Sequence, residues 1–179
     1  MKLVLDACVL YPTVMREVLL GAANAGFYTP VWSARILEEW ARAAARLDPA
    51  QEVQARGEIA LIRAAFAKAE EPVATGLEAR LWLPDKNDIH VLATAVASSA
   101  DGIVTLNSKD FPRGVLAEEG LSRHDPDSLM MDFLHQDKAA IERVCTRVLQ
   151  QAQLLSGQTW DMRALLKKAR LPRLAKALG

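Results

Sequence analysis

The chain has 179 residues, of which 51% are hydrophobic and 25% charged, and its 22 Lys and Arg balance its 22 Asp and Glu. This composition excludes collagen-like, disordered and mucin-like chains, and the neutral total gives no global attraction to nucleic acid or to membranes. Cys8 and Cys145 lack the spacing of a disulfide framework or a zinc ribbon. No apolar run reaches the roughly 18 residues of a membrane span. We therefore expect a cytoplasmic protein with no membrane partner.

The amino-terminal half alternates short apolar runs with helical periodicity. Residues 2–5 form a Val- and Leu-rich strand, and helical spacing follows over residues 13–25. Ser33 is suited to cap a helix over residues 34–47, and an alanine-rich helix is expected over residues 51–69. A short apolar strand followed by a helix is the opening of an α/β unit.

The same alternation continues to about residue 125 and then stops. A helix is predicted over residues 88–100 and a buried strand over residues 103–106. Beyond residue 125 the pattern is helical, over residues 128–134, 138–155 and 162–169. Strands alternating with helices predict an α/β fold with a mostly parallel central sheet that helices cover on both faces. We expect this body to cover residues 1–125, with carboxyl-terminal helices over residues 126–179.

Acidic residues fall at the ends of the predicted strands and at a helix start. Asp6 ends the first strand, Asp85 and Asp88 open the helix before the second strand, and Asp110 follows that strand. Open α/β sheets bind ligands beyond the carboxyl ends of their strands. Taken singly, each of these acids is explained as well by helix capping or turn formation. Helical periodicity also leaves Glu38 and Glu39 equivalent, because each lies just outside the apolar arc of its helix.

Taken together, these acids predict a site for a divalent cation. Clustered carboxylates repel one another and raise one another's pKa unless a cation holds them. Oxygen-only ligands suit Mg²⁺ or Mn²⁺ rather than zinc or copper. Such ions activate water and neutralise the charge of a phosphate during its transfer. The pattern is therefore typical of a metal-dependent nuclease.

Three segments of the chain resemble the PIN domain, the fold of the VapC toxins and related ribonucleases. They are LVLDACVL, SARILEEW and PDKNDIHVLATAVASSADGIVTLNSKDFP, and the resemblance covers residues 1–125. The later PDSLMMDFL and the helices after it resemble a larger PIN subgroup with a carboxyl-terminal extension. The resemblance implies a Rossmann-like α/β/α sandwich with a mostly parallel central sheet. It also implies endonuclease activity on single-stranded RNA, with Mg²⁺ or Mn²⁺ as cofactor.

The resemblance also implies a role for each acid. Asp6 matches the first metal-binding carboxylate and Asp88 the third, with Asp85 as an outer neighbour. The family's helix glutamate precedes a large apolar residue, so that Glu39, just before Trp40, matches better than Glu38.

At the fourth acidic position the sequence departs from part of the family. Many members carry Asp where this chain has Asn107, and the nearest acid here is Asp110. Asn brings an oxygen but no charge, which weakens the expected second metal site. Thr105 matches the family's hydroxyl residue near the metal. The implied metal ligands are Asp6, Asp88 and Asp110, and Glu39 completes the catalytic set.

Several functions remain open at this stage. The resemblance implies the toxin of a toxin–antitoxin pair, with an antitoxin protein as partner and a homodimer as a candidate assembly. A non-catalytic PIN-like module that binds RNA or a protein is the main alternative, and Asn107 favours it. A haloacid-dehalogenase-type phosphatase is disfavoured, because it needs a second Asp two residues after the first and position 8 is Cys8. His90 is expected to be a packing residue.

The last part of the chain is unusually basic. From Met162 to the end there are six Lys or Arg and no acid. Lys167, Lys168 and Arg170 are therefore candidate RNA-binding residues, because phosphates attract local positive charge. The competing interpretation is a solvated amphipathic helix whose cations suit its carboxyl end.

Overall fold

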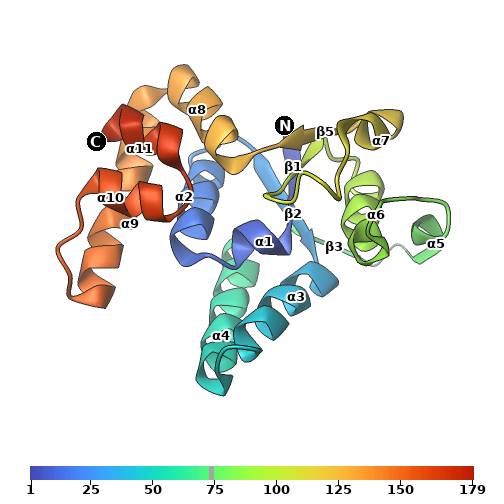
Figure 1. Ribbon diagram of the computed structural model, residues 1–179, viewed down its shortest axis with the longest axis horizontal. Helices are drawn as coiled ribbons and strands as arrows, with labels where there is room; N and C mark the ends of the chain where they lie inside the picture. Colours follow the sequence, from blue (N-terminus) through green and yellow to red (C-terminus); the bar gives the residue numbers. More distant parts are fainter. Residues whose placement is uncertain (73–74) are drawn as a thin grey trace. The chain divides into compact units, whose positions relative to one another are not determined.

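The computed structural model describes residues 1–72 and 75–179, and Figure 1 shows its elements in chain order. Two compact units are distinguished. The sheet unit consists of Met1–Tyr11 and Thr29–Arg123, and the helical unit of Pro12–Tyr28 and His124–Gly179. Pro12–Tyr28 thus packs with the carboxyl-terminal helices, although the sequence pattern continues without a break there. The division into domains 1–125 and 126–179 stays a prediction.

The sheet unit contains the strands and seven of the helical segments in the described residues. The strands are β1 (Lys2–Leu5), β2 (Thr29–Ser33), β3 (Glu70–Glu71), β4 (Gly102–Val104) and β5 (Ser122–His124), whose last residue belongs to the helical unit. The helical segments are α1 (Ala7–Leu10), α3 (Ala34–Ala45), α4 (Pro49–Ala65), α5 (Thr75–Glu78), the 3-10 helix η1 (Lys86–Asp88), α6 (Ile89–Ala97) and α7 (Arg113–Glu118).

The central sheet has the strand order β3-β2-β1-β4-β5. β1 pairs in parallel with β2 and with β4, and β2 pairs in parallel with β3. Leu3, Val4 and Leu5 of β1 are fully buried. A continuous apolar run of this kind is typical of a parallel strand covered on both faces by helices. The predicted α/β fold with a mostly parallel sheet is confirmed.

The strand order reverses between β1 and β4, which places their carboxyl ends side by side. Leu5 pairs with Val104 at the end of this ladder, and the backbone N–H of Asp6 donates to the Val104 carbonyl at 3.1 Å. In open α/β sheets, such a reversal leaves a crevice beyond the strand ends where ligands bind. Asp6 and Thr105, which follow the two strands directly, therefore meet at this point.

Strand β2 has no counterpart among the predicted elements, and its sequence contains Pro30. The N–H groups of Thr29 and Trp32 donate to opposite neighbours, to Met1 and to Ala69. Pro30 lies on the same side as Trp32, before the two-residue β3 begins. Because the missing N–H of Pro30 faces a part of the edge without a partner strand, the proline is tolerated here.

Three predicted elements end earlier in the structure than their periodicity indicates. The alanine-rich helix ends at Ala65 because the following residues turn into the sheet, where the Ala69 carbonyl accepts from Trp32 at 2.9 Å. α6 ends at Ala97, after which Ser99 adopts a left-handed backbone with φ of 51°. β4 ends at Val104 because the Thr105 hydroxyl is bonded to Asp6.

The helical unit is built from α2 (Thr13–Asn24), α8 (Pro126–Gln136), α9 (Lys138–Ser156), α10 (Met162–Lys168) and α11 (Pro172–Leu178). Helix α2 packs against α8, α9 and α10. A side chain at Gly21 would come within 2.6 Å of Val144, so glycine permits the close approach of α2 and α9. In the part of the chain that the structure describes, no helix is long and apolar enough to cross a bilayer.

Candidate metal centre

Asp6 occupies the first position of the site and is held by two side chains. Its Oδ2 accepts from the Thr105 hydroxyl at 2.7 Å and from the Cys8 thiol at 3.0 Å. Asp6 is the N-cap of the short helix α1 but makes no side-chain capping bond. The buried carboxylate is thus oriented by groups from both strand ends rather than by its own helix.

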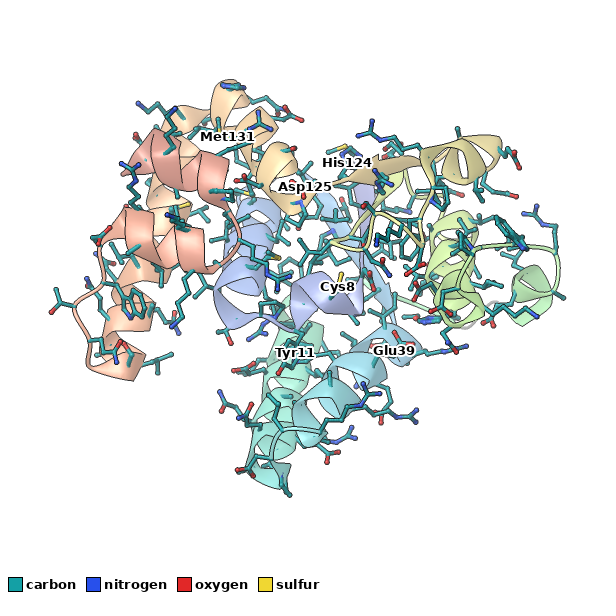
Figure 2. The ribbon with its side chains drawn as sticks, in the orientation of Figure 1. Cys8, Tyr11, Glu39, His124, Asp125 and Met131 are labelled. Carbon is teal, nitrogen blue, oxygen red and sulfur yellow. The ribbon has the colours of Figure 1, made fainter. Side chains whose placement is uncertain are left out.

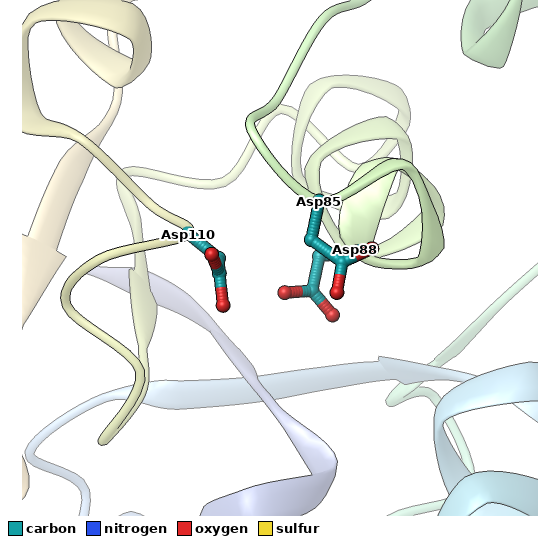
Figure 3. A group of neighbouring side chains, drawn as sticks. All are labelled: Asp85, Asp88 and Asp110. Atoms are coloured by element: carbon teal, nitrogen blue, oxygen red, sulfur yellow. The ribbon is translucent and has the colours of Figure 1, made fainter.

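Asp85 and Asp88 lie at the start of α6, and the structure separates their roles. The Oδ1 of Asp85 accepts from the backbone N–H of Asn87 at 2.8 Å, so Asp85 caps η1. Asp88 is the N-cap of α6, yet its side chain makes no capping bond. Figure 3 shows the carboxylates of Asp85 and Asp88 on one side and that of Asp110 on the other, directed toward a common space. Helix capping therefore accounts for Asp85 but not for Asp88.

Asn107 bridges two of the carboxylates from the loop after β4. Its side-chain amide donates to Asp110 at 2.6 Å and to Asp88 at 3.3 Å, while its backbone N–H donates to the Thr105 hydroxyl at 2.9 Å. Asn107 thus holds two acids together as a neutral donor. Its amide hydrogens compensate part of the repulsion between Asp88 and Asp110.

The charge of the cluster is not neutralised by protein cations. Among the described residues, none of Asp6, Asp85, Asp88 and Asp110 forms an ion pair with Lys or Arg. Burial, followed by the charges of Asp6, Asp85, Asp110 and Glu39, raises the pKa of Asp88 from 3.8 to about 6. Ionised Asp88 is therefore unfavourable in this structure unless a cation is added.

The donor set fits a hard divalent cation. Asp85, Asp88 and Asp110 each offer one oxygen, and these atoms lie within 4.8 Å of one another. The set contains carboxylate oxygens and no sulfur or imidazole nitrogen, which matches the ligand preference of Mg²⁺ and Mn²⁺. The sequence predicted Asp6, rather than Asp85, as a metal ligand. In the structure Asp6 is not among the three grouped oxygens, but its charge, after burial, contributes to the raised pKa of Asp88.

The two neighbouring glutamates of α3 have different surroundings. Figure 2 labels Glu39 on this helix, and its Oε1 lies 2.7 Å from Nε2 of His90 and, in a longer ion pair, 3.8 Å from Nε of Arg35. Glu38 instead accepts from Arg42 at 3.2 Å and from Arg56 at 3.0 Å, and these arginines lower its pKa. Because Glu39 also raises the pKa of Asp88, it is the glutamate whose charge reaches the cluster.

His90 and Cys8 are contacts of the site that sequence reasoning did not assign to it. His90 is 3% exposed, so the expected packing role holds, but the ring also abuts Glu39. The contact has hydrogen-bond length without hydrogen-bond alignment, and Nδ1 has no partner among the described residues. Burial and the charge of Asp6 raise the pKa of the Cys8 thiol to about 12, so Cys8 is a donor rather than a nucleophile. His90 comes two residues after Asp88, and Cys8 comes two residues after Asp6. This closeness in the sequence was the signal that could have placed them at the site.

Comparison with known protein families agrees with this arrangement. The family model described as PIN domain matches residues 2–109. This chain belongs to the PIN domain family. The match includes every acid of the cluster except Asp110, which follows its last residue. PIN domains are generally nucleases that use divalent metals, and the acidic cluster of this PIN domain fits such a cofactor. Searches of curated proteins and of solved structures returned no match to this chain.

Proposed function

We propose that this PIN domain protein is a Mg²⁺- or Mn²⁺-dependent endoribonuclease that cleaves single-stranded RNA. Asp6, Glu39, Asp88 and Asp110 form the catalytic set, of which Asp6, Asp88 and Asp110 hold the metal. Asp85, Thr105 and Asn107 support them. Asp85 is a second candidate for a direct ligand, because its carboxylate oxygen lies within 4.8 Å of those of Asp88 and Asp110.

The observation that carries the proposal is the state of Asp88. Its carboxylate begins a helix without capping it and offers an oxygen within 4.8 Å of those of Asp85 and Asp110. Burial, followed by the charges of four other acids, raises its pKa. An arrangement that destabilises the empty fold is retained where it serves binding or catalysis. Helix capping, which explains Asp85, does not explain this carboxylate.

Each protein group has a defined task in phosphodiester hydrolysis. When bound, the cation supplies Lewis acidity, which neutralises phosphate charge and makes water more acidic. Thr105 and Cys8 fix the orientation of Asp6, and Asn107 holds Asp88 and Asp110 together, so that these carboxylates would hold the cation. We assign to Glu39, whose carboxylate contacts His90, the role of accepting a proton from an attacking water.

The cellular role that we propose is that of a VapC-like toxin. The support is the sequence resemblance across residues 1–125, including the larger PIN subgroup with extra helices after PDSLMMDFL. Such a toxin acts in the cytoplasm and has a cognate antitoxin protein as partner, with a homodimer as its candidate assembly. A small DNA-binding protein encoded beside this chain would support the role, and its absence would remove it without affecting the nuclease proposal.

A non-catalytic PIN-like module that binds RNA or a protein is the second candidate. It is favoured by Asn107, which stands where many relatives of this family carry an acid and donates to two carboxylates. Such a module needs no metal, so it predicts that Asp88 substitutions leave all measured functions unchanged.

Cleavage of a labelled single-stranded RNA in Mn²⁺ distinguishes the two candidates. We expect wild-type protein to cleave, EDTA to abolish cleavage, and Asp88→Asn to be inactive at every Mn²⁺ concentration. Asp132→Asn is the matched control, because Asp132 is an exposed aspartate of the helical unit. Cleavage by the Asp88→Asn protein equal to that of wild type, or robust cleavage in EDTA, would contradict the proposal.

A further inference from the structure

The carboxyl-terminal helices carry a group of cations that the acidic site does not use. Helices α10 and α11 pack against each other as a hairpin, drawn in red in Figure 1. Their apolar residues, such as Leu165, Leu166 and Leu174, are buried. The exposed positions carry Arg163, Lys167, Lys168, Arg170, Arg173 and Lys176. We call these six residues the basic hairpin.

None of the six cations is paired with a carboxylate in the described residues. The sheet unit behaves differently, because Arg35, Arg42, Arg56, Arg63 and Arg80 all form ion pairs there. The nearest acids of the helical unit are occupied by backbone groups. Asp161 caps α10, and buried Asp127 accepts from the N–H groups of Arg173 and Leu174. The positive charge of the hairpin is therefore open to an external anion.

The helix dipole explains only half of this charge. Lys167, Lys168 and Lys176 lie in last turns, where a cation is favourable. Arg163 and Arg173 are the second residues of α10 and α11, where a cation opposes the dipole.

Arg170 is also disfavoured at its position on local grounds. It follows α10 with a left-handed backbone, φ 60°, a conformation that favours glycine. Arg173 donates from its guanidinium to the Ser128 hydroxyl at 3.0 Å, which gives it a structural contact. Local stability therefore does not account for Arg163 or Arg170.

An aromatic face lies among these cations. The Nζ of Lys168 lies over one face of the Trp160 ring, 4.8 Å from the ring centroid, and Trp160 is half-buried just before α10. A base that stacks on this ring would use its other face or displace Lys168. Positive charge beside an aromatic face is the combination with which proteins bind single strands, since bases stack on the ring while cations contact phosphates. A protein partner with an acidic surface would use the charge but not the ring.

We propose that the basic hairpin binds the phosphate backbone of single-stranded RNA, with Trp160 as a base-stacking surface. This inference rests on the proposed ribonuclease function, for which it supplies a substrate-binding surface separate from the metal site. Binding through phosphates makes affinity fall as salt rises, with a slope of about 0.7 per contact for single strands. The chemistry recognises the backbone rather than a base sequence.

The test measures binding of a fluorescent oligouridylate in EDTA across a salt series, so that no cleavage is needed. We expect Lys167→Gln/Lys168→Gln/Arg170→Gln to weaken binding and to reduce the salt slope by up to about 2. Arg46→Gln/Lys68→Gln is the control, because these exposed cations of the sheet unit have no ion pair among the described residues. An equal loss in the control, or an unchanged slope in the triple variant, would overturn the proposal.

Arg170→Gly separates a binding role from a structural one. Glycine relieves the left-handed backbone, so the melting temperature rises while RNA affinity falls. Ser99→Gly is matched to it, because Ser99 has φ of 51° after α6 and carries no charge. We expect that variant to gain stability and to keep full affinity. Arg170→Gly protein that binds RNA like wild type would show that the cation has no such role.

Two further experiments identify the class of ligand. Trp160→Phe keeps an aromatic face and is expected to bind normally, whereas Trp160→Leu should bind about 5- to 150-fold more weakly. Polyglutamate is expected to compete poorly, and competition equal to RNA per charge would favour a protein partner and overturn the proposal. If wild-type protein binds RNA through the hairpin but never cleaves it, the nuclease proposal fails while this inference stands.

Discussion

Four of the five aspartates of the helical unit accept hydrogen bonds from backbone N–H groups, whereas Asp88 of the sheet unit accepts none. Asp125, Asp137 and Asp161 cap α8, α9 and α10, and Asp127 holds the start of α11. Asp88 is surrounded instead by other carboxylates and by the amide of Asn107. The same residue type therefore stabilises one unit and destabilises the other until a cation is bound.

The basic side chains of the two units differ in the opposite way, since those of the sheet unit are the ones with partners. In the sheet unit, arginines such as Arg42 and Arg56 pair with glutamates, and these pairs leave the aspartate cluster without a cation. In the helical unit all aspartates but exposed Asp132 accept from backbone N–H groups, and the cations of the basic hairpin have no carboxylate partner among the described residues. A charged side chain that has no ion-pair or hydrogen-bond partner in the protein is a candidate for ligand binding. The number of charges in a region does not indicate this.

The largest expected effect is the loss of cleavage in Asp6→Asn. Loss of a residue that only supports a metal ligand typically lowers metal affinity or activity about 10- to 100-fold. Because Asp6 is proposed as a ligand itself, we expect its loss to lower the cleavage rate about 100-fold or more. The melting temperature should change little, because the amide keeps an acceptor for Thr105 while repulsion falls. Binding of RNA in EDTA should be unchanged. Full cleavage by this variant would remove Asp6 from the site.

Asp127→Ala tests the structural role of an aspartate in the helical unit. Asp127 is 5% exposed, and its loss leaves two N–H groups of α11 without an acceptor. We expect the free energy of unfolding to fall by roughly 3–5 kcal/mol. Urea denaturation measures this change, and exposed Asp132→Ala should stay within about 0.5 kcal/mol of wild type. A destabilisation no larger than that of the control would refute the structural role.

Glu39→Gln and Glu38→Gln each remove the charge of one of two adjacent glutamates in α3. We expect Glu39→Gln to slow cleavage about 10- to 100-fold, as for a carboxylate in proton transfer or in the metal's outer shell. Glu38→Gln removes exposed pairs with Arg42 and Arg56, which are worth at most about 1 kcal/mol of stability each. Rates from single-turnover cleavage decide between them, and a greater loss at Glu38 would reverse the assignment.

The smallest expected effect is a pH-dependent stability difference in metal-free protein. Because the pKa of Asp88 is raised from 3.8 to about 6, its ionisation disfavours the folded state. This cost in folding free energy is absent below about pH 4, grows between about pH 4 and pH 6, and is fully present above about pH 6. In EDTA, Asp88→Asn should therefore melt a few degrees above wild type at neutral pH and equally at about pH 4.

Adding Mn²⁺ is expected to reverse that difference. A ligand that binds only the folded protein raises its melting temperature, so wild type should gain stability that Asp88→Asn does not. A wild-type melting temperature independent of Mn²⁺ would show that the cluster does not bind this ion.

The sequence by itself determined the α/β class, the first strand, most helices and the position of each acid at a strand end or helix start. These follow from local periodicity and from capping chemistry, which act over a few residues. It did not predict β2, β3 or β5. Pro30 obscures β2, and β3 is a two-residue strand whose pairing depends on a partner far along the chain.

Only the tertiary structure decided which donors and charges surround each candidate acid. Parallel pairing of β1 with β4 brings Asp6 to Thr105, 99 residues away, and the same pairing sets Asn107 between Asp88 and Asp110. Glu38 and Glu39, equal in periodicity, were separated by His90 and Arg56, which reach them from other elements. The physical reason is that a carboxylate's role depends on which donors and charges surround it, and long-range packing supplies those neighbours.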